Sequence, residues 1–280
     1  MRATPPPFQL TERDVTILRD VARHRLLRST HISLLLDAPH KKVSDRLTRL
    51  FHAGYLERPR AQLAYHVAGG GSSPIVYGLS PRGARLLAEH GDATPVHVVA
   101  ADCDRLFSLH TLAIADFRVA LRVALRARPD VRLIDDEALP AASATPLRVD
   151  VASGAAVAIV PDCVFSLQRA DGARRNYCVE MDRGTMPIAR ASLAQSSVMR
   201  KVVAYAAARE QRLYERQYGW MNFRVLIATA TAERADNIRA AVAASAPRSA
   251  SLFYIAEQSV FVTAPLCGWC DVDGEQRSLL

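Results

Sequence analysis

The sequence has few cysteines, no long apolar segment and no apolar segment at its start. Five cysteines in 280 residues are too few, and odd in number, for a disulfide framework. No apolar run approaches the roughly 20 residues that a membrane-spanning helix needs, and the proline-rich first ten residues lack the core of a secretory signal. We therefore expect a cytoplasmic protein that does not associate with membranes.

Several common catalytic motifs are also missing. Gly69–Gly71 are not followed by the Lys-Ser/Thr pair of a phosphate-binding loop, so we expect no nucleotide cofactor. There is no GxSxG elbow and no HExxH zinc motif. Cys267 and Cys270 have CxxC spacing, but no second cysteine pair or nearby histidine completes a zinc site. These absences argue against P-loop enzymes, serine hydrolases of the elbow type and zinc proteases.

The positive charge is concentrated in the first third of the chain. The formal net charge is +8, and residues 1–91 contribute nearly all of it, with 14 Lys and Arg against 7 Asp and Glu. A compact basic segment joined to a near-neutral remainder is typical of a polyanion-binding module attached to a second domain. We expect the polyanion to be double-stranded DNA.

The first 91 residues have the element order of a winged helix-turn-helix domain. Apolar spacing and capping residues predict helices over residues 11–25, 29–37, 41–53 and 81–90, and strands over 64–68 and 75–79. In such domains the third helix lies in the major groove, and the hairpin contacts the backbone beside it. The basic residues opposite the apolar face of that helix and beside the hairpin are the predicted DNA contacts: Lys41, Lys42, Arg46, Arg49, Arg58 and Arg60.

Residues 92–104 are predicted to form a linker, and residues 105–280 a second, α/β (α+β) domain with a mixed sheet flanked by helices. Its expected helices cover residues 106–127, 187–209 and 232–244. A hairpin is predicted from strands 162–168 and 176–182, joined by the turn Asp171-Gly172. Further strands are expected over residues 131–134, 147–151, 156–159, 223–229, 251–255 and 260–263.

Three carboxylates lie on this predicted hairpin. Asp162 opens the first strand, and strand alternation places Glu180 and Asp182 on one face of the second. Carboxylates on mostly apolar strands are costly unless they are paired, solvated or bound to a cation. Their hard oxygen atoms suit Mg²⁺ or Mn²⁺, which activate water in phosphodiester hydrolysis. The sequence thus predicts a Mg²⁺ or Mn²⁺ site at Asp162 and Glu180, with solvated strand ends as the alternative.

These motifs resemble those of a known family. Pro161-Asp162 followed by Glu180-x-Asp182 is similar to the PD-(D/E)xK core of restriction-endonuclease-like proteins. The string from Val179 to Thr185, with Lys201 and Tyr205 after it and the His110-x-x-Ala-x-x-Asp-Phe117 segment before it, resembles the replication-relaxation proteins of mobile elements over about residues 9–265. The resemblance implies a restriction-like second domain, and a role in plasmid replication and mobilisation through DNA relaxation.

One position departs from the nuclease signature. The signature ends in lysine, whereas residue 182 is Asp. Lys201 is one of only three lysines in the chain, and it lies one helical turn before Tyr205, so both can project from one helix face. The hypothesis is that Lys201 replaces the signature lysine and points toward Glu180. The predicted catalytic set is Asp162, Glu180, Asp182 and Lys201.

Three functions remain open from the sequence. The first is a metal-dependent DNA nuclease, which the acidic trio and Lys201 favour. The second is a non-catalytic accessory protein for replication or relaxation, which Asp182 in place of lysine favours; a relaxase or a replication initiator would be its protein partner. The third is a transcriptional regulator whose second domain senses a ligand or dimerises. The oligomeric state is also open.

Overall fold

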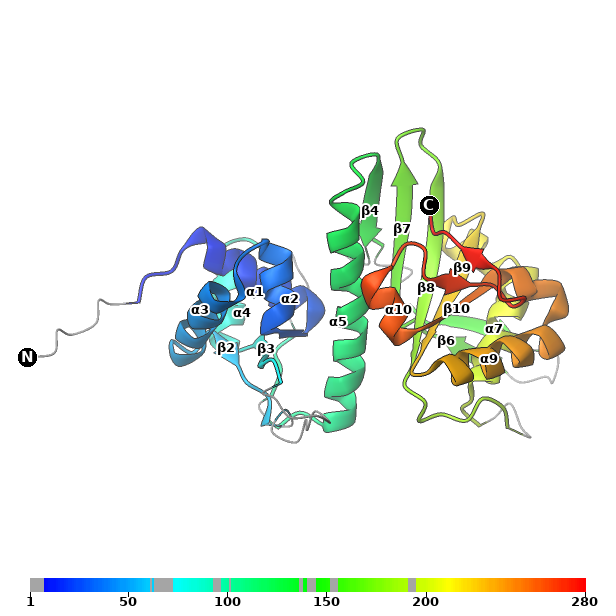
Figure 1. The fold of residues 1–280 in the computed structure, drawn as a ribbon, viewed down its shortest axis with the longest axis horizontal. Coiled ribbons are helices and arrows are strands. Elements are labelled where there is room, and N and C mark those ends of the chain that lie inside the picture. Colours follow the sequence, from blue (N-terminus) through cyan, green and yellow to red (C-terminus); the bar gives the residue numbers. More distant parts are fainter. Residues whose placement is uncertain are drawn as a thin grey trace, which may run out of the picture. The chain divides into compact units, whose positions relative to one another are not determined.

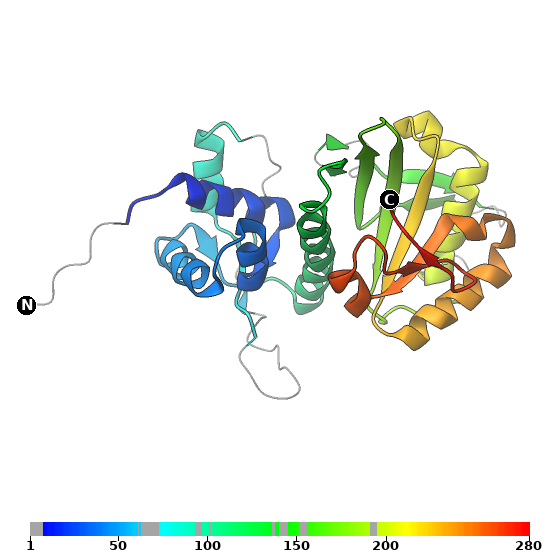
Figure 2. The same cartoon turned by 45° about the horizontal axis from the view of Figure 1, so that its top comes forward.

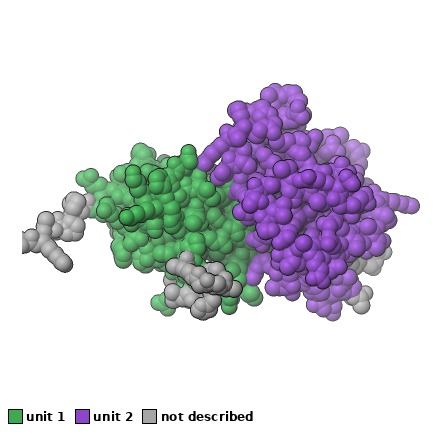
Figure 3. All heavy atoms as spheres, viewed as in Figure 1, with its two compact units in different colours: residues 1–119 green, residues 120–280 purple. Residues whose placement is uncertain are grey.

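The chain has a mixed α/β fold, as predicted, and its contacts divide it into two units, residues 1–119 and 120–280 (Figure 3). Among the residues described below, no helix is both long enough and apolar enough to cross a membrane. The computed structural model describes residues 8–60, 62, 73–92, 97–100, 102–135, 138–139, 145–151, 156–190 and 195–280.

The first unit contains the predicted helices together with a small sheet (Figure 1). The predicted strand over residues 64–68 lies outside the described residues. Strands β1, β3 and β2 form an antiparallel sheet in that order, and β1 has no counterpart among the predicted elements. The elements are α1 (Glu12–His24), β1 (Leu26–Arg28), α2 (Ser29–Leu36), α3 (His40–His52), β2 (Leu56–Glu57), β3 (Val76–Leu79) and α4 (Pro81–Glu89).

Helix α5 spans Arg105–Leu125. Its contacts place the residues up to Val119 in the first unit. Leu112 packs in a buried cluster with Leu26 and Val76 of the small sheet. Asp116 accepts a hydrogen bond from His31, with 2.7 Å between Oδ1 and Nε2, and it also pairs with Arg28. Because these contacts hold the first part of α5 against the small sheet, the contact boundary falls later in the chain than residue 105, where we expected the second domain to begin.

The second unit is built on a seven-stranded mixed sheet of order β12-β11-β10-β9-β8-β7-β4. Strands β8, β9 and β10 are parallel, and the other neighbours pair antiparallel; the central strands run side by side in both ribbon views (Figures 1 and 2). The seven strands are β4 (Val131–Asp135), β7 (Cys163–Arg169), β8 (Arg174–Asp182), β9 (Phe223–Thr229), β10 (Phe253–Glu257), β11 (Trp269–Cys270) and β12 (Gln276–Arg277).

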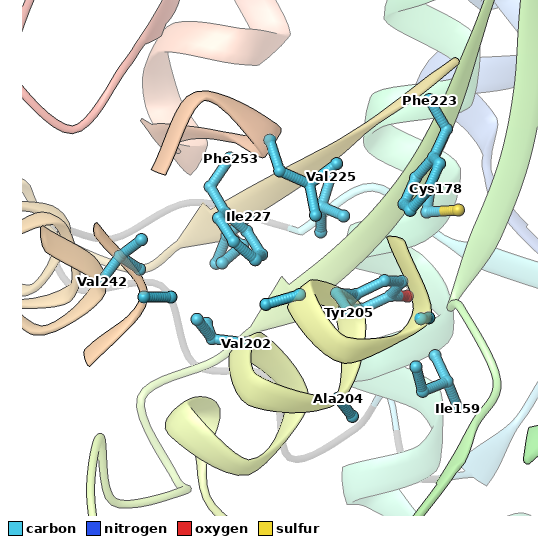
Figure 4. Close-up of a cluster of buried hydrophobic side chains, with 14 of the residues drawn as sticks. Ile159, Cys178, Val202, Ala204, Tyr205, Phe223, Val225, Ile227, Val242 and Phe253 are labelled. Carbon is cyan, nitrogen blue, oxygen red and sulfur yellow. The ribbon is translucent and has the colours of Figure 1, made fainter. Parts of the chain in front are cut away.

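The main core of this unit lies between the sheet and the helices α7 (Val198–Glu210) and α9 (Ala232–Ser245). A two-stranded sheet of β5 (Leu147–Asp150) and β6 (Ala156–Ile159) also contributes to this core. Strand β9 is apolar and buried along most of its length, as expected for a central parallel strand covered on both faces. Tyr205 of α7 lies in this core among side chains of β8 and β9 (Figure 4).

The predicted helix over residues 187–209 begins too early. Helix α7 starts at Val198, after Ser197, whose hydroxyl accepts the Arg200 amide at 3.1 Å. Pro187 and Ile188 instead lie against the first turn, where their carbonyls accept the amides of Val198 and Met199 at 3.2 and 2.9 Å. The helix stops near Glu210, and the separate helix α8 (Leu213–Tyr218) follows Arg212, whose φ is +53°.

The predicted strand over residues 260–263 is wrong. These residues belong to the short helix α10 (Gln258–Thr263). The β-branched residues of this segment favour a strand, but the helix brings Phe261 onto the buried ring of Trp269, with 6.3 Å between ring centroids. Packing of this aromatic pair has therefore overridden local propensity.

Candidate functional site

The predicted hairpin forms as β7 and β8, and it brings Asp162 next to the strand that carries Glu180. The amide of Asp162 donates to the carbonyl of Val179 at 2.9 Å, and its Oδ2 accepts the amide of Met181 at 2.7 Å. Asp162 is therefore held on both sides of Glu180, by its main-chain amide at Val179 and by its carboxylate at Met181. This placement follows from the pairing of Cys163 with Val179 at the end of the hairpin.

Glu180 is buried and has two side-chain partners, both from α7. Its Oε1 accepts the hydroxyl of Tyr205 at 2.6 Å, and its Oε2 pairs with the ammonium of Lys201. The Glu180 side chain is 6% exposed, whereas that of Lys201 is 41% exposed. Lys201 thus connects the buried Glu180 carboxylate to the surface, and its predicted role as a substitute for the signature lysine stays a prediction.

Burial and the neighbouring charges shift the pKa values of three side chains in this cluster. Burial raises the pKa of Glu180 to about 7, against the opposing field of the Lys201 ammonium. Burial would lower the pKa of Lys201, but the carboxylates of Glu180 and Asp162 outweigh it and raise that pKa above its ordinary value. Burial and the Glu180 charge raise the pKa of Tyr205 well above its ordinary value. At neutral pH the site therefore holds a stable ammonium and a neutral phenol that donates to Glu180.

Asp182, the third predicted catalytic carboxylate, has partners of its own. Its Oδ1 lies 3.0 Å from the Nη2 of Arg234, and Oδ2 accepts the Nε of Arg234 and the hydroxyl of Thr229, the latter at 2.8 Å. Arg234 also donates to the carbonyl of Met186. This bidentate pair joins the end of β8 to α9 and to the loop after β8. Because the carboxylate is compensated in place, we assign Asp182 a structural role and leave it out of the proposed catalytic set.

A cavity of about 230 Å³ opens beside Glu180. It lies between β6, the end of β8 and the start of α7, and Lys201, Arg200 and Ser197 contribute to its lining. The Nε of Arg200 is buried and has no hydrogen-bond partner among the described residues. A buried donor without a partner is costly, so this wall of the cavity favours a ligand with an acceptor oxygen.

The donor set fits Mg²⁺ or Mn²⁺ bound by two carboxylates. Mg²⁺ is commonly held by one or two carboxylates together with water and substrate phosphate, and Asp162 and Glu180 supply two such groups. No cluster of three or more His, Cys, Asp or Glu side chains with metal-binding geometry is found in the described part of the chain. A metal at this position would therefore depend on water and phosphate oxygens for its remaining ligands.

The six predicted DNA-contacting residues fall into two groups. Lys41, Lys42 and Arg49 are exposed on α3, opposite the buried Val43 and Leu47, as the periodicity predicts. The three cations of α3 form the surface that we call the α3 basic face, and Arg60 is a separate exposed cation after β2.

Arg46 and Arg58 are instead engaged inside the first unit. Arg46 pairs in a bidentate way with Asp14, whose side chain is fully buried, and its Nε lies 2.6 Å from Oδ1. The guanidinium of Arg58 donates to the hydroxyls of Thr48 and Tyr77, each at 3.0 Å, and stacks over a neighbouring aromatic ring. Both residues lie near the predicted surface, but Arg46 is held by Asp14 and the Nη2 of Arg58 is used within the fold.

Sequence reasoning missed Arg234, Arg200 and Thr229. Thr229 ends β9 next to the end of β8, and parallel strands end at one edge of a sheet. Its position as a polar residue at the end of an apolar strand could therefore have identified Thr229 from the sequence. Nothing in the local pattern singles out Arg200 or Arg234 from the many other arginines, because their roles depend on how α7 and α9 pack.

A family model described as replication-relaxation matches residues 18–223, well over half of the chain. The match runs from α1 to the start of β9, so it includes the α3 basic face together with Asp162, Glu180 and Lys201. A search of curated proteins and a search of solved structures each found no match. The family match indicates a role in plasmid replication or mobilisation. On this evidence the chain belongs to the replication-relaxation family.

Proposed function

We propose that this protein binds duplex DNA of a plasmid or other mobile element through the α3 basic face, in a winged helix-turn-helix arrangement. We further propose that the Asp162–Glu180–Lys201 cluster, within a restriction-endonuclease-like unit, nicks the bound DNA in a Mg²⁺- or Mn²⁺-dependent reaction. The observation that carries the nuclease proposal is the contact between Lys201 and Glu180 beside Asp162. It pairs a cation with the Glu180 carboxylate, and the charge of Asp162 also acts on that cation, although residue 182 is not lysine.

Each side chain has a distinct task in this proposal. Asp162 and Glu180 would hold the metal, which supplies charge neutralisation at the phosphate and a more acidic water. Lys201 places a positive charge beside the buried Glu180 carboxylate, where it would stabilise the negative charge that develops on the phosphate oxygens. Tyr205 orients Glu180 from the core side. Arg200 also lines the cavity, and its guanidinium would be a phosphate-binding donor there.

A second candidate function is a non-catalytic accessory protein that uses the same DNA-binding surface. The observation that favours it is the full engagement of Glu180, since both of its oxygens already have protein partners. In this case Lys201 would serve only to compensate a buried charge. Direct assays of metal binding and nicking separate the two candidates.

The metal site predicts a specific thermal response. We expect Mn²⁺ at a tenfold excess over its Kd to stabilise the protein by about 1.4 kcal/mol, which corresponds to an increase in melting temperature of about 3 °C. Asp162→Asn should abolish this increase, because the amide oxygen is a poor metal ligand. The substitution should not unfold the protein, since the Asn Oδ1 still accepts the Met181 amide. Differential scanning calorimetry with and without Mn²⁺ makes the measurement.

Asp273→Asn is the matched control for that measurement. Asp273 is an exposed carboxylate near the end of the chain, so its substitution changes the net charge by the same amount. This variant should keep the full Mn²⁺ response. An Asp162→Asn protein that is stabilised by Mn²⁺ as strongly as the wild type would refute the proposed site.

The DNA-binding proposal predicts a change in salt dependence. Lys42→Ala should weaken duplex binding and lower the slope of log K against log salt by about 1, because one phosphate contact and its counterion release are lost. Fluorescence anisotropy over a salt series measures both quantities. Arg85→Ala removes an exposed cation from α4 and should leave the slope unchanged. A fragment of residues 105–280 that bound duplex DNA as tightly as the full chain would contradict this assignment.

A further inference from the structure

A second basic cavity lies at the opposite end of the parallel strands from Glu180. It measures about 470 Å³, and the first residues of β8 and β9 line it together with Tyr254 of β10. Three arginines are part of this lining, Arg174, Arg175 and Arg224, and no Asp or Glu side chain is. The cavity is separate from the proposed metal site, because none of its lining residues contributes to the cavity beside Glu180.

Among the described residues, none of the three guanidinium groups contacts an acidic side chain. Arg174 donates to Asn176 and Ser166 at 3.1 Å, and Arg224 donates to the carbonyl of its neighbour Phe223 at 3.2 Å, with its Nε 3.5 Å from the hydroxyl of Tyr254. Arg175 donates to the main-chain oxygen of Leu280 at 2.9 Å. Within the described part of the chain, Arg174 and Arg224 therefore have neutral partners, and no carboxylate side chain pairs with any of the three.

Other arginines of residues 120–280 occur both with and without acidic partners. Arg122, Arg234 and Arg277 pair with Asp135, Asp182 and Asp271, whereas Arg148 and Arg216 are exposed and have no ion pair among the described residues. The cavity differs in that three arginines surround one concavity whose lining includes no acidic side chain, an arrangement that produces a local positive potential and attracts an anionic ligand.

The shape of the surface points to a chain of phosphates. A neighbouring cavity of about 250 Å³ shares Asn222, Phe223 and Arg224 with the first and is also lined by Arg209 and by the Arg212–Glu215 ion pair. The concave surface thus continues past Arg224, with Arg209 as a further cation. Cavities of this size are too narrow for a duplex, but a single strand fits such a groove. The ring of Tyr254 is half-buried, and the Arg224 guanidinium lies 5.9 Å from its centroid; basic grooves with aromatic side chains are typical of single-strand binding.

We propose that the Arg174–Arg175–Arg224 cavity is a binding site for single-stranded nucleic acid, with phosphates on the arginines and a base against Tyr254. This site is additional to the α3 basic face and does not depend on the proposed nuclease. A single strand bound here would be held by the second unit, while duplex affinity belongs to the first.

The test uses the full-length protein and a fluorescein-labelled oligothymidylate. Arg224→Gln should weaken its binding about tenfold, because a charge-assisted hydrogen bond to phosphate is lost. Arg175→Gln, at an exposed position where misfolding is not a concern, should weaken it in the same direction. Both variants should bind duplex DNA like the wild type. Arg148→Gln, an exposed arginine of β5 that lines neither cavity, is the matched control.

Photo-crosslinking locates the bound strand. An oligonucleotide containing 5-iododeoxyuridine should crosslink to the peptide that contains Tyr254, and Arg224→Gln should reduce the yield. Crosslinks confined to residues 40–60 would overturn the proposal, as would unchanged oligothymidylate affinity in both variants. Polyglutamate that bound this surface as tightly as the oligonucleotide would also overturn it, in favour of an acidic protein partner. Loss of duplex binding in Lys42→Ala leaves this proposal untouched.

Discussion

Lys201→Met is expected to lower the rate of Mn²⁺-dependent nicking by at least about 100-fold, the usual cost of removing one charge-stabilising donor from an active site. Methionine fills a similar volume but carries no charge. The raised pKa of Lys201 means that the wild-type residue remains an ammonium over the whole range in which DNA is assayed. In the proposed reaction its loss would therefore remove a full positive charge next to the scissile phosphate. Single-turnover nicking of a supercoiled plasmid measures the rate.

Duplex affinity separates a catalytic role of Lys201 from a general loss of binding. Because duplex affinity is assigned to the α3 basic face, Lys201→Met should retain it. Arg216→Ala removes an exposed cation from α8 in the same unit and should nick at the wild-type rate. Wild-type protein that binds duplex DNA but never nicks it with Mn²⁺ or Mg²⁺ would establish the accessory function instead. Normal nicking by Lys201→Met would show that its contact with Glu180 is only structural.

Arg46→Ala is expected to destabilise the first unit by about 3–5 kcal/mol, because it leaves the buried carboxylate of Asp14 without its compensating charge. The Asp14 side chain is 0% exposed. It also accepts the amide and hydroxyl of Thr11 at 2.7 and 2.8 Å, so it is fixed in place as the N3 residue of the capping box of α1. Urea unfolding followed by circular dichroism gives the change in the free energy of unfolding.

Arg49→Ala is the control for this prediction. Arg49 lies on the same helix but is exposed, and substitutions at such positions usually change stability by less than about 0.5 kcal/mol. Asp14→Asn combined with Arg46→Met removes both charges and should recover part of the lost stability. Equal stability of Arg46→Ala and Arg49→Ala would show that Asp14 does not need its partner. Any loss of DNA binding in Arg46→Ala would then have to reflect a direct contact.

The same ion pair makes the first unit sensitive to acid. Burial alone would raise the pKa of Asp14, but hydrogen bonds from Arg46 and Thr11 outweigh it and hold the pKa below its ordinary value. A depressed pKa in the folded state contributes stability that is fully present above the unfolded value of about 3.9. This contribution is lost as the pH falls through the folded value. We therefore expect wild-type stability to decrease below about pH 4, and Asp14→Asn to show a weaker decrease.

The sequence correctly predicts the helices and turns that local residue patterns specify. Residues 41–53 have apolar residues at helical spacing, and α3 forms there. Asp171-Gly172 forms the hairpin turn, where Gly172 has a φ of +85°. The segments that the sequence assigns wrongly are those whose conformation depends on contacts with a neighbouring element. The carbonyls of Pro187 and Ile188 accept hydrogen bonds from amides of α7, and Phe261, which lies in a helix, packs on Trp269.

The sequence alone determined which residues are candidates for the chemistry, because hairpin alternation, the family resemblance and the rarity of lysine predict Asp162, Glu180, Asp182 and Lys201 without any structure. Only the tertiary structure decided how the charges pair. Arg46 and Arg49 differ little in the sequence, yet one compensates the buried Asp14 and the other is exposed. Likewise Asp182 pairs with an arginine 52 residues later in the chain. A charge can be counted from the sequence, but its partner depends on which elements pack together, and a buried charge must have one.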